Sequence, residues 1–334
     1  MFRFVCIVAA ITMLASTTFA QSTPPGLYGV NLAGADFGTG NVPGEFGVEY
    51  TYPTADEVAH FTAEGMTVFR LPFLWERLQP TPNSALNGAE LNRIKTFVSS
   101  VLERDAWVVL DPHNSARYYG EIIGASDVQI ADFVDFWTRL ATEFADQPTV
   151  IFGLINEPYD MQTELWLETA NAAIAGIRAT GARNLILVPG NGWSGAHAWG
   201  DDYYGTANAD VMGAINDPFG NFAYEVHQYL DEDSSGTAPE CVSETIGAER
   251  LDFFTKWLKT NGARGFLGEF AGGRNPTCMA AVDNMLTYLD AHEDVWLGWA
   301  WWAAGPWWGD DMYTLEPEAG RRRAYLDILG AHIH

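Results

Sequence analysis

Eight short apolar runs recur along this chain, and helical patterns or long connections separate them. Strands that are buried on both faces read as nearly continuous apolar runs, and their alternation with amphipathic helices is typical of parallel sheets. Eight strand–helix units predict a single (β/α)8 TIM barrel of the α/β class. We expect its strands at Leu27–Leu32, Thr67–Leu71, Trp107–Asp111, Val150–Ile155, Leu185–Pro189, Phe222–Tyr229, Gly265–Glu269 and Val295–Trp302.

The helical patterns between these strands supply the outer layer of the predicted barrel. Thr54, Ser126 and Ser243 each precede such a pattern, where a hydroxyl can accept a bond from an unpaired backbone N–H. We therefore expect helices at Thr54–Glu64, Gly88–Arg104, Asp127–Phe144, Gln162–Arg178, Ser243–Lys259, Cys278–Ala291 and Gly320–Leu329.

Residues 190–220 break the alternation, because this segment is rich in Gly, Asn, Asp, Trp and Tyr. We expect a long loop with one short helix, and a loop of this length in a compact domain is usually functional. An open doubly wound sheet would also fit the alternation. That fold normally carries a glycine-rich phosphate loop after its first strand, and Val30–Ala35 is not one.

The first 20 residues have the pattern of a cleavable signal peptide. Arg3 precedes an apolar stretch over 4–14, and small and polar residues then lead to Ala20. A membrane anchor is the alternative, but a hydrocarbon core needs about 20 apolar residues. We expect cleavage after Ala20, secretion, and one catalytic domain over 21–334, because no linker or change in composition marks a further boundary.

The formal net charge of −25 also restricts the partners of the chain. Such a surface repels nucleic acid and anionic membranes, and it suits an exported monomer with a neutral substrate. The seven His form no metal-binding spacing on a helix, so we expect neither a metal nor a cofactor. A serine hydrolase site at Ser194 is a weak alternative, since Gly192–Ala196 lacks the final Gly of the motif.

Polar and aromatic groups follow the apolar bodies of most predicted strands. The active site of a barrel lies at the carboxyl ends of its strands, so these groups are the candidates for a functional site. They are Arg70, His113, Asn114, Asn156, Glu157, His227, Tyr229, Glu269, Trp301 and Trp302.

Two of these candidates are glutamates in similar settings, Glu157 before Pro158 and Glu269 after Gly268. Hydrolysis of a glycosidic bond needs one carboxylic acid to protonate the leaving oxygen and a second carboxylate to attack or to activate water. We predict Glu157 as acid/base and Glu269 as nucleophile. The alternative is that either is an ordinary carboxylate in a salt bridge, and Glu225 is the chief rival.

The other polar candidates support this pair. Arg70 needs a buried partner, and we expect Glu269, with Asp111 and Glu225 as alternatives. Asn156 and Glu157 are adjacent, so both reach the site only if the strand ends in a bend. Tyr229 has the strand parity to bond the nucleophile through its hydroxyl. His113 and His227 remain open between functional and structural roles.

The chain has 13 Trp, and flat indole rings stack well on the apolar faces of sugars. We expect loop positions for Trp75, Trp193, Trp199, Trp307 and Trp308, and core packing for Trp107, Trp137, Trp166, Trp257 and Trp296. Among all of them we expect Trp193, Trp302 and Trp307 to bind substrate.

Two cysteines remain once Cys6 leaves with the signal. Thiols oxidise readily in an exported chain, so Cys241 and Cys278 form either one disulfide or two buried free thiols.

Together these motifs resemble glycoside hydrolase family 5, particularly its secreted endo-β-1,4-glucanases. The resemblance runs from about Gly29 to Pro317. It rests on Phe69-Arg70-Leu71-Pro72, Asp111-Pro112-His113-Asn114, Asn156-Glu157-Pro158, Val226-His227-Gln228-Tyr229-Leu230-Asp231, Gly268-Glu269-Phe270 and Trp301-Trp302.

The resemblance implies a (β/α)8 barrel that hydrolyses β-1,4-glucan with retention, using Glu157 as acid/base and Glu269 as nucleophile. The supporting residues that it implies are Arg70, His113, Asn156, His227, Tyr229 and one Trp of the last strand, for which we favour Trp302. We add Asn114, Trp193 and Trp307 as substrate contacts. The positions of Cys241 and Cys278 also resemble a disulfide of related cellulases.

Three functions therefore remain to be separated. The first is an endo-glucanase, and the second is the same mechanism acting on β-mannan, xyloglucan or mixed-linkage glucan. The third is a non-catalytic carbohydrate-binding barrel, which would leave two intact carboxylates unexplained. Because the sequence shows no linker or separate carbohydrate-binding module, we expect weak binding to crystalline cellulose.

Overall fold

The computed structural model describes residues 26–334. The predicted signal peptide over 1–20 lies outside the described residues. Within the described range, no helix combines the length and the apolar character that a membrane span requires.

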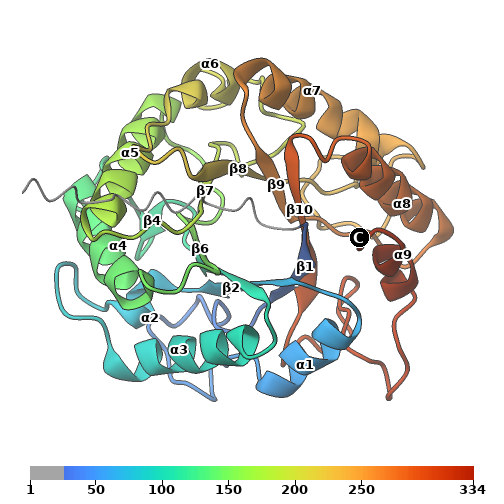
Figure 1. Ribbon diagram of the computed structural model, residues 1–334, viewed down its shortest axis with the longest axis horizontal. Coiled ribbons are helices and arrows are strands. Elements are labelled where there is room, and N and C mark those ends of the chain that lie inside the picture. The colour runs from blue at the N-terminus through green and yellow to red at the C-terminus, as the bar shows by residue number, and fades with distance from the viewer. Residues whose placement is uncertain (1–25) are drawn as a thin grey trace, which may run out of the picture.

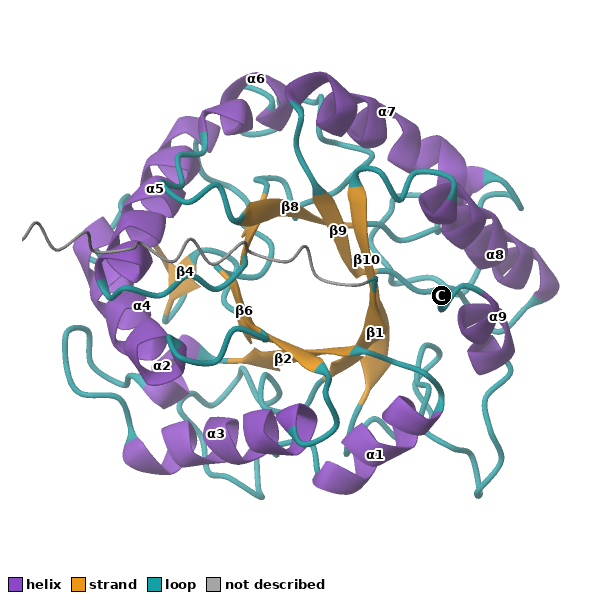
Figure 2. Cartoon of the chain, in the orientation of Figure 1, coloured by secondary structure: helices purple, strands orange, loops and turns teal. Residues whose placement is uncertain are grey.

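Eight parallel strands close into a barrel, and helices surround it on the outside (Figures 1 and 2). The order around the barrel is β1-β10-β9-β8-β7-β6-β3-β2, so chain neighbours are neighbours in space. This arrangement confirms the predicted (β/α)8 fold. The strands are β1 Leu27–Leu32, β2 Val68–Phe73, β3 Trp107–Pro112, β6 Val150–Gly153, β7 Ile186–Pro189, β8 Phe222–His227, β9 Gly265–Glu269 and β10 Trp296–Ala304.

The helices of the outer layer follow the predicted order. Thr54 caps α1 as expected, with its hydroxyl accepting from the backbone N–H of Glu57. The helical segments are α1 Ala55–Ala63, α2 Trp75–Leu78, α3 Gly88–Leu102, α4 Ile130–Phe144, α5 Thr163–Ala179, α6 Asn208–Val211, the 3-10 turn η1 Met212–Ala214, α7 Ile246–Asn261, α8 Pro276–Asp290 and α9 Tyr325–Ala331. The short α6 and η1 lie in the long loop over 190–220.

Two predicted caps are wrong, because each hydroxyl bonds within a local turn instead. The Ser126 hydroxyl accepts from Val128 N, and α4 begins only at Ile130. The Ser243 hydroxyl accepts from Thr245 N, so α7 begins three residues later than expected. The last helix also begins later than predicted, at Tyr325, because Gly320 and its neighbours form a turn.

Two small elements were not predicted, and both lie beside the barrel mouth. Helix α2 follows β2, and a hairpin of β4 (Arg117–Tyr118) and β5 (Glu121–Ile122) follows β3. Trp75 and Trp199 are fully buried, which corrects their expected exposure on loops. Trp75 begins α2 and packs against Phe136 of α4, with ring centroids 5.1 Å apart. Trp199 packs from its loop against Phe254 of α7.

The side chains inside the barrel are apolar at one end and polar at the other. Val68 on β2 and Ala223 on β8 belong to an apolar cluster inside the barrel. Two residues further along the same strands, Arg70 and Glu225 are buried and polar. Because alternate residues of a strand face the same side, both layers project inward, and the polar layer lies at the carboxyl ends. The fold therefore places its charged groups on an apolar floor.

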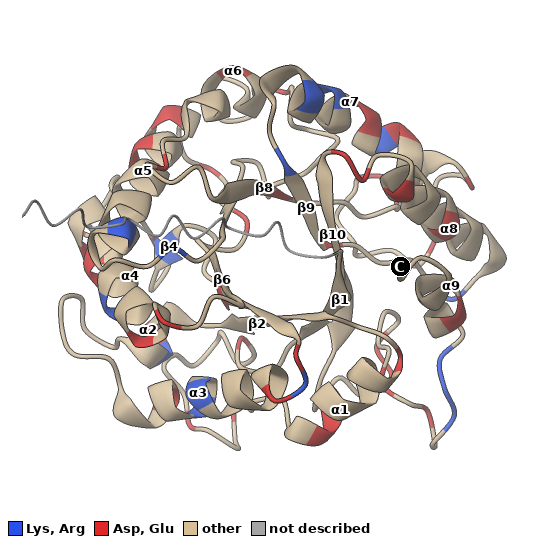
Figure 3. Cartoon of the chain, in the orientation of Figure 1, with Lys and Arg blue, Asp and Glu red and all other residues tan. Residues whose placement is uncertain are grey.

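Acidic side chains are spread over the outer helices, whereas basic ones are few and scattered (Figure 3). The net charge of −25 is therefore mainly a property of the surface.

Candidate active site

Arg70 is the centre of the polar layer and is fully buried. Its Nη1 lies 2.9 Å from Glu269 Oε1 and 3.1 Å from Asp111 Oδ2. Its Nε lies 2.9 Å from Glu225 Oε1, and its Nη2 donates to Asn156 Oδ1 at 2.8 Å. Arg70 thus contacts the partner expected for it and both alternatives at once. One guanidinium with a fixed fork of donors holds groups from four strands in one geometry.

Asn31 is a member of this network that the sequence reasoning missed. Its Oδ1 accepts from Arg70 Nη1 at 2.9 Å, and its Nδ2 donates to the carbonyls of Gly268 and Trp301. Asn31 is a fully buried amide in the otherwise apolar end of β1. An amide inside an apolar run was therefore the signal that would have identified it.

The chain bends sharply after β6, and this bend serves two adjacent side chains. The strand ends at Gly153, two residues before the predicted end, and Glu157 takes a left-handed backbone with φ of 40°. Asn156 therefore points to Arg70, while Glu157 Oε1 lies 2.7 Å from His227 Nδ1. The bend that the adjacent pair requires is present.

Glu269 ends β9 and has three polar neighbours. It accepts from Arg70, its Oε2 accepts from the Tyr229 hydroxyl at 2.8 Å, and His227 Nδ1 lies 3.6 Å away. Burial raises the pKa of the Glu269 carboxyl, and the charges of His227 and Arg70 act in the opposite direction. The Tyr229 contact is the predicted one, although β8 ends at His227, two residues before the predicted end, so Tyr229 lies on the loop that follows the strand.

Glu157 and Glu269 face one another across a small gap. One carboxylate oxygen from each, together with a ring nitrogen of His227, lie within 4.8 Å of one another. Retaining glycosidases separate their carboxyl groups by about 5–5.5 Å, whereas inverting enzymes need about 6.5–9.5 Å to admit water. Arg70 pairs with Glu269, and His227 lies against Glu157 in the same gap.

His227 and His113 both have carboxylate partners. Burial alone lowers the pKa of His227, but Glu269, Glu157 and Glu225 outweigh it and raise the pKa to about 10. His113 Nδ1 lies 2.8 Å from Asp111 Oδ2, and this contact raises the pKa of His113 against the effect of burial.

The two adjacent Trp of β10 lie in different surroundings. Trp301 is fully buried, and its Nε1 donates to the Tyr313 carbonyl at 2.8 Å. Trp302 is half-buried and stacks on His113, with ring centroids 5.4 Å apart and planes at 14°. Of the two, Trp302 is therefore the ring beside the site. Trp307 is 52% exposed on the loop that follows β10.

A hollow of about 500 Å³ opens from Glu157. Trp193 lines it and is 46% exposed, and its indole stacks on Tyr159 with centroids 4.8 Å apart. The rest of the wall comes from the loops after β7 and β8, including His197, Tyr203, Tyr229, Asp233, Ser234 and Ser235. The long loop over 190–220 thus contributes the aromatic side of the hollow.

Asn114 lies in a second hollow of about 560 Å³ beside His113 and Tyr119. Its Oδ1 accepts from Trp75 N at 2.8 Å, and its Nδ2 donates to Glu76 Oε2 at 2.6 Å. The amide therefore fixes the turn into α2 and has one N–H hydrogen left for another partner.

The serine alternative does not fit the geometry. Ser194 is fully buried, its hydroxyl donates to the Glu225 carbonyl at 2.6 Å, and it accepts from Gly190 N. Both bonds hold the chain in place after β7, so this hydroxyl faces the backbone and not the hollow.

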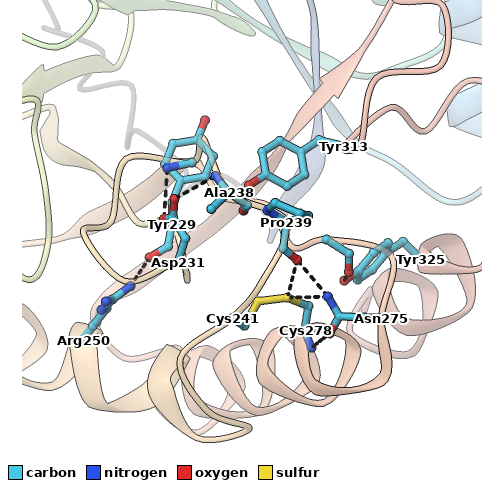
Figure 4. Close-up of a disulfide and its surroundings, with 12 residues drawn as sticks. Tyr229, Asp231, Ala238, Pro239, Cys241, Arg250, Asn275, Cys278, Tyr313 and Tyr325 are labelled. Atoms are coloured by element: carbon cyan, nitrogen blue, oxygen red, sulfur yellow. Dashed lines mark hydrogen bonds between the residues drawn. A yellow bond between two sulfur atoms is a disulfide. The ribbon is translucent and has the colours of Figure 1, made fainter.

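Cys241 and Cys278 form a disulfide, and the alternative of two free thiols is wrong. The bond ties the loop after β8 to the start of α8 (Figure 4). Asn275 Nδ2 donates to the Pro239 carbonyl at 2.8 Å, close to the sulfur atoms. The anchored loop includes Asp233, Ser234 and Ser235, so the disulfide supports one wall of the hollow.

Comparison with known proteins places this site in a family. A family model described as cellulase (glycosyl hydrolase family 5) matches residues 30–305. Endo-beta-1,4-glucanase B of Emericella nidulans is 44% identical over 323 residues, which cover 96% of this chain and 95% of that protein. Endo-beta-1,4-glucanase A of the same fungus is 47% identical, over 90% of each chain.

Solved structures agree with these relatives. An endo-beta-1,4-glucanase from Xanthomonas axonopodis pv. citri has a TM-score of 0.90 and 48% identity, over 92% of this chain and 98% of that one. XacCel5A in complex with cellopentaose also has a TM-score of 0.90, with 46% identity over 92% of this chain and 99% of that one. The chain therefore belongs to the cellulase family, glycosyl hydrolase family 5.

Proposed function

We propose that this protein is a retaining endo-β-1,4-glucanase that cuts internal bonds of cellulose or related β-glucans. The observation that carries the proposal is the pair Glu157 and Glu269, whose carboxylate oxygens approach within 4.8 Å across one gap. A double displacement needs this short separation, because the second carboxylate must itself reach the sugar. Relatives named as endo-β-1,4-glucanases support the choice of glycan.

In the first step, an oxygen of Glu269 attacks the anomeric carbon from one face. Glu157 gives its proton to the glycosidic oxygen, the carbon–oxygen bond breaks, and the leaving chain departs with a free hydroxyl. In the second step, Glu157 takes a proton from water, which attacks the same carbon and releases Glu269. Two inversions at one carbon give net retention.

The supporting residues hold the carboxyl groups of Glu157 and Glu269 in position for the reaction. Arg70 and Tyr229 fix both oxygens of Glu269, so the attacking carboxylate does not rotate away. His227 donates to Glu157 and stabilises the carboxylate that remains after proton transfer. Asn156 and His113 complete the polar shell around the sugar next to the cleaved bond.

The aromatic residues provide the sugar-binding surfaces in this proposal. Trp193 lines the same hollow as Glu157, so a sugar stacked on its ring lies beside the proton donor. Trp302 stacks on His113 and offers its free face beside the gap. Trp307 and Asn114 serve as further contacts at the rim.

The test compares the hydrolysis of several polysaccharides by the form of the protein that begins at Gln21. We expect carboxymethylcellulose to lose viscosity faster than reducing ends accumulate, because internal cuts shorten chains early. Preferred hydrolysis of mannan, xyloglucan or lichenan would favour the alternative glycans. A glycosyl adduct of a 2-fluoro glycoside on Glu269 would exclude a non-catalytic binding barrel, and its complete absence would count against the mechanism.

Export and assembly belong to the same proposal. We propose that the first 20 residues direct secretion, that cleavage follows Ala20, and that the mature protein acts as a monomer. Mass spectrometry of the secreted protein should find Gln21 at its N-terminus, and light scattering should give the mass of one chain. Little protein should sediment with crystalline cellulose.

A further inference from the structure

Glu225 has no part in the mechanism described above, although it lies directly beneath it. The side chain is 1% exposed and projects into the barrel from β8, two residues before His227. Gly268 makes room for it, since a Cβ there would lie 2.1 Å from Glu225 Oε1. A side chain at this position, directly before Glu269, would therefore displace the buried Glu225 carboxylate.

The carboxylate contacts two cationic groups of the site. Glu225 Oε1 lies 2.9 Å from Arg70 Nε and 3.6 Å from His227 Nε2. Arg70 turns its remaining nitrogens to Glu269 and Asn156, and Glu225 is paired with the third nitrogen, Nε, through an ion pair without hydrogen-bond geometry. Burial raises the pKa of Glu225, but Arg70 and His227 outweigh it and hold the pKa below its ordinary value.

His227 stands between two carboxylates. Its Nδ1 lies 2.7 Å from Glu157 Oε1, and its Nε2 faces Glu225. At 3.6 Å the Nε2 contact is too long for a hydrogen bond, so it is attractive as an ion pair when the ring is an imidazolium, with Nδ1–H directed at Glu157. The charged groups that face the ring are Glu157, Glu225 and Glu269. Arg70 is the cation that shares Glu225 and Glu269 with the ring.

We propose that Glu225 is a positioning residue that keeps His227 doubly protonated, with Nδ1–H directed at Glu157, and keeps Arg70 turned toward Glu269. The role in catalysis rests on the proposed function, because it acts through the acid/base and the nucleophile. The protonation of His227 is independent of that function and can be measured without substrate.

The first test is an NMR titration of the protein with ¹⁵N-labelled histidine, with the His227 signals assigned through His227→Gln. We expect the wild-type His227 ring to remain an imidazolium above pH 8. In Glu225→Gln, we expect the same ring to lose its proton at a pH at least about one unit lower than in the wild type. Glu90→Gln is the matched control, because Glu90 is also buried but bonds Tyr50 and Tyr52 away from the site. Its His227 titration should equal that of the wild type.

The second test is the pH dependence of hydrolysis. In Glu225→Gln we expect the alkaline limb of kcat/KM to move to lower pH, and kcat to fall about tenfold or more with little change in KM. A purely structural role for Glu225 would lower the melting temperature and leave the pH profile in place, which would overturn the proposal.

Two further outcomes keep the proposal separate from the function. A neutral His227 in the wild type at pH 7 would overturn it even if Glu225→Gln did not fold. An imidazolium that responds to Glu225→Gln in a protein inactive on every glucan would defeat the proposed function and leave the link between Glu225 and His227 standing.

Discussion

Tyr229 and Arg70 approach the two oxygens of Glu269 from opposite sides of the barrel mouth. Tyr229 bonds Oε2 and Arg70 bonds Oε1, so each oxygen has its own donor. In the proposed reaction, a carboxylate held in this way loses little freedom when it attacks. At the scale of single residues, the reaction therefore depends on orientation as much as on acidity.

The proposed nucleophile gives the most direct prediction at this scale. Glu269→Ala removes the oxygen proposed to attack, so we expect turnover of carboxymethylcellulose to fall by about four orders of magnitude or more. The fold should survive, as circular dichroism and the melting curve would show. Activity above about 1% of the wild type would mean that another carboxylate attacks the sugar.

Tyr229→Phe removes one hydrogen bond to the Glu269 carboxylate and keeps the ring. Such a bond is worth about 1.5–3 kcal/mol, so kcat should fall roughly tenfold to hundredfold, with KM almost unchanged. Tyr224→Phe is the control, because that tyrosine is also buried, but it lies on β8 and its hydroxyl donates to the Met212 carbonyl outside the barrel. Equal effects of the two variants would show that the loss is not specific to Glu269.

The sequence indicated which charged residues lie at the carboxyl ends of the strands better than it indicated their contacts. Arg70, Glu157 and Glu269 stand out because a charge at the end of an apolar strand costs free energy unless it has a partner. The pattern could not show that Arg70 holds three carboxylates at once, since that requires the barrel to bring four strands together. Asn31 was missed because a single polar residue within an apolar strand is common and does not by itself indicate a functional site.

At the scale of elements, strand ends were harder to predict than strand bodies. β6 stops at Gly153 because the chain must bend before Glu157, and β10 continues to Ala304 past the predicted end. The residues just before and just after these strand ends are equally apolar. Pairing with neighbouring strands sets where each strand ends, and pairing is a property of the closed sheet and not of local sequence.

The disulfide gives a prediction for the loop after β8. Cys241 and Cys278 are separated by 37 positions in the sequence, and the bond between them restricts the unfolded chain. Replacing both by Ser should therefore lower the free energy of unfolding by about 4 kcal/mol. Because the loop carries Asp233–Ser235, KM for cellopentaose should rise more than kcat falls. Chemical denaturation and steady-state kinetics would measure both effects, and unchanged stability would contradict the prediction.

At the scale of the whole molecule, the surface charge should influence which glucans are bound well. The net charge of −25 repels carboxymethylcellulose, which is itself a polyanion. Raising the salt concentration from about 0.01 M to about 0.15 M shortens the Debye length from about 30 Å to about 8 Å. We therefore expect KM for carboxymethylcellulose to fall severalfold, with kcat unchanged.

Hydroxyethylcellulose is the matched substrate for this experiment, because it is soluble and uncharged. Its KM should not respond to salt over the same range. A parallel change for both polymers would mean that salt acts on the protein itself and not on the repulsion between like charges.

The apolar floor beneath Arg70 and Glu225 has a kinetic consequence. It closes the polar layer from below, so among the described residues water reaches Glu157 and Glu269 from the open carboxyl end, where the proposed glycan would also lie. In the proposed reaction, a leaving chain that remains at this end hinders the water that attacks the sugar bound to Glu269. Faster departure of the first product would then speed the second step.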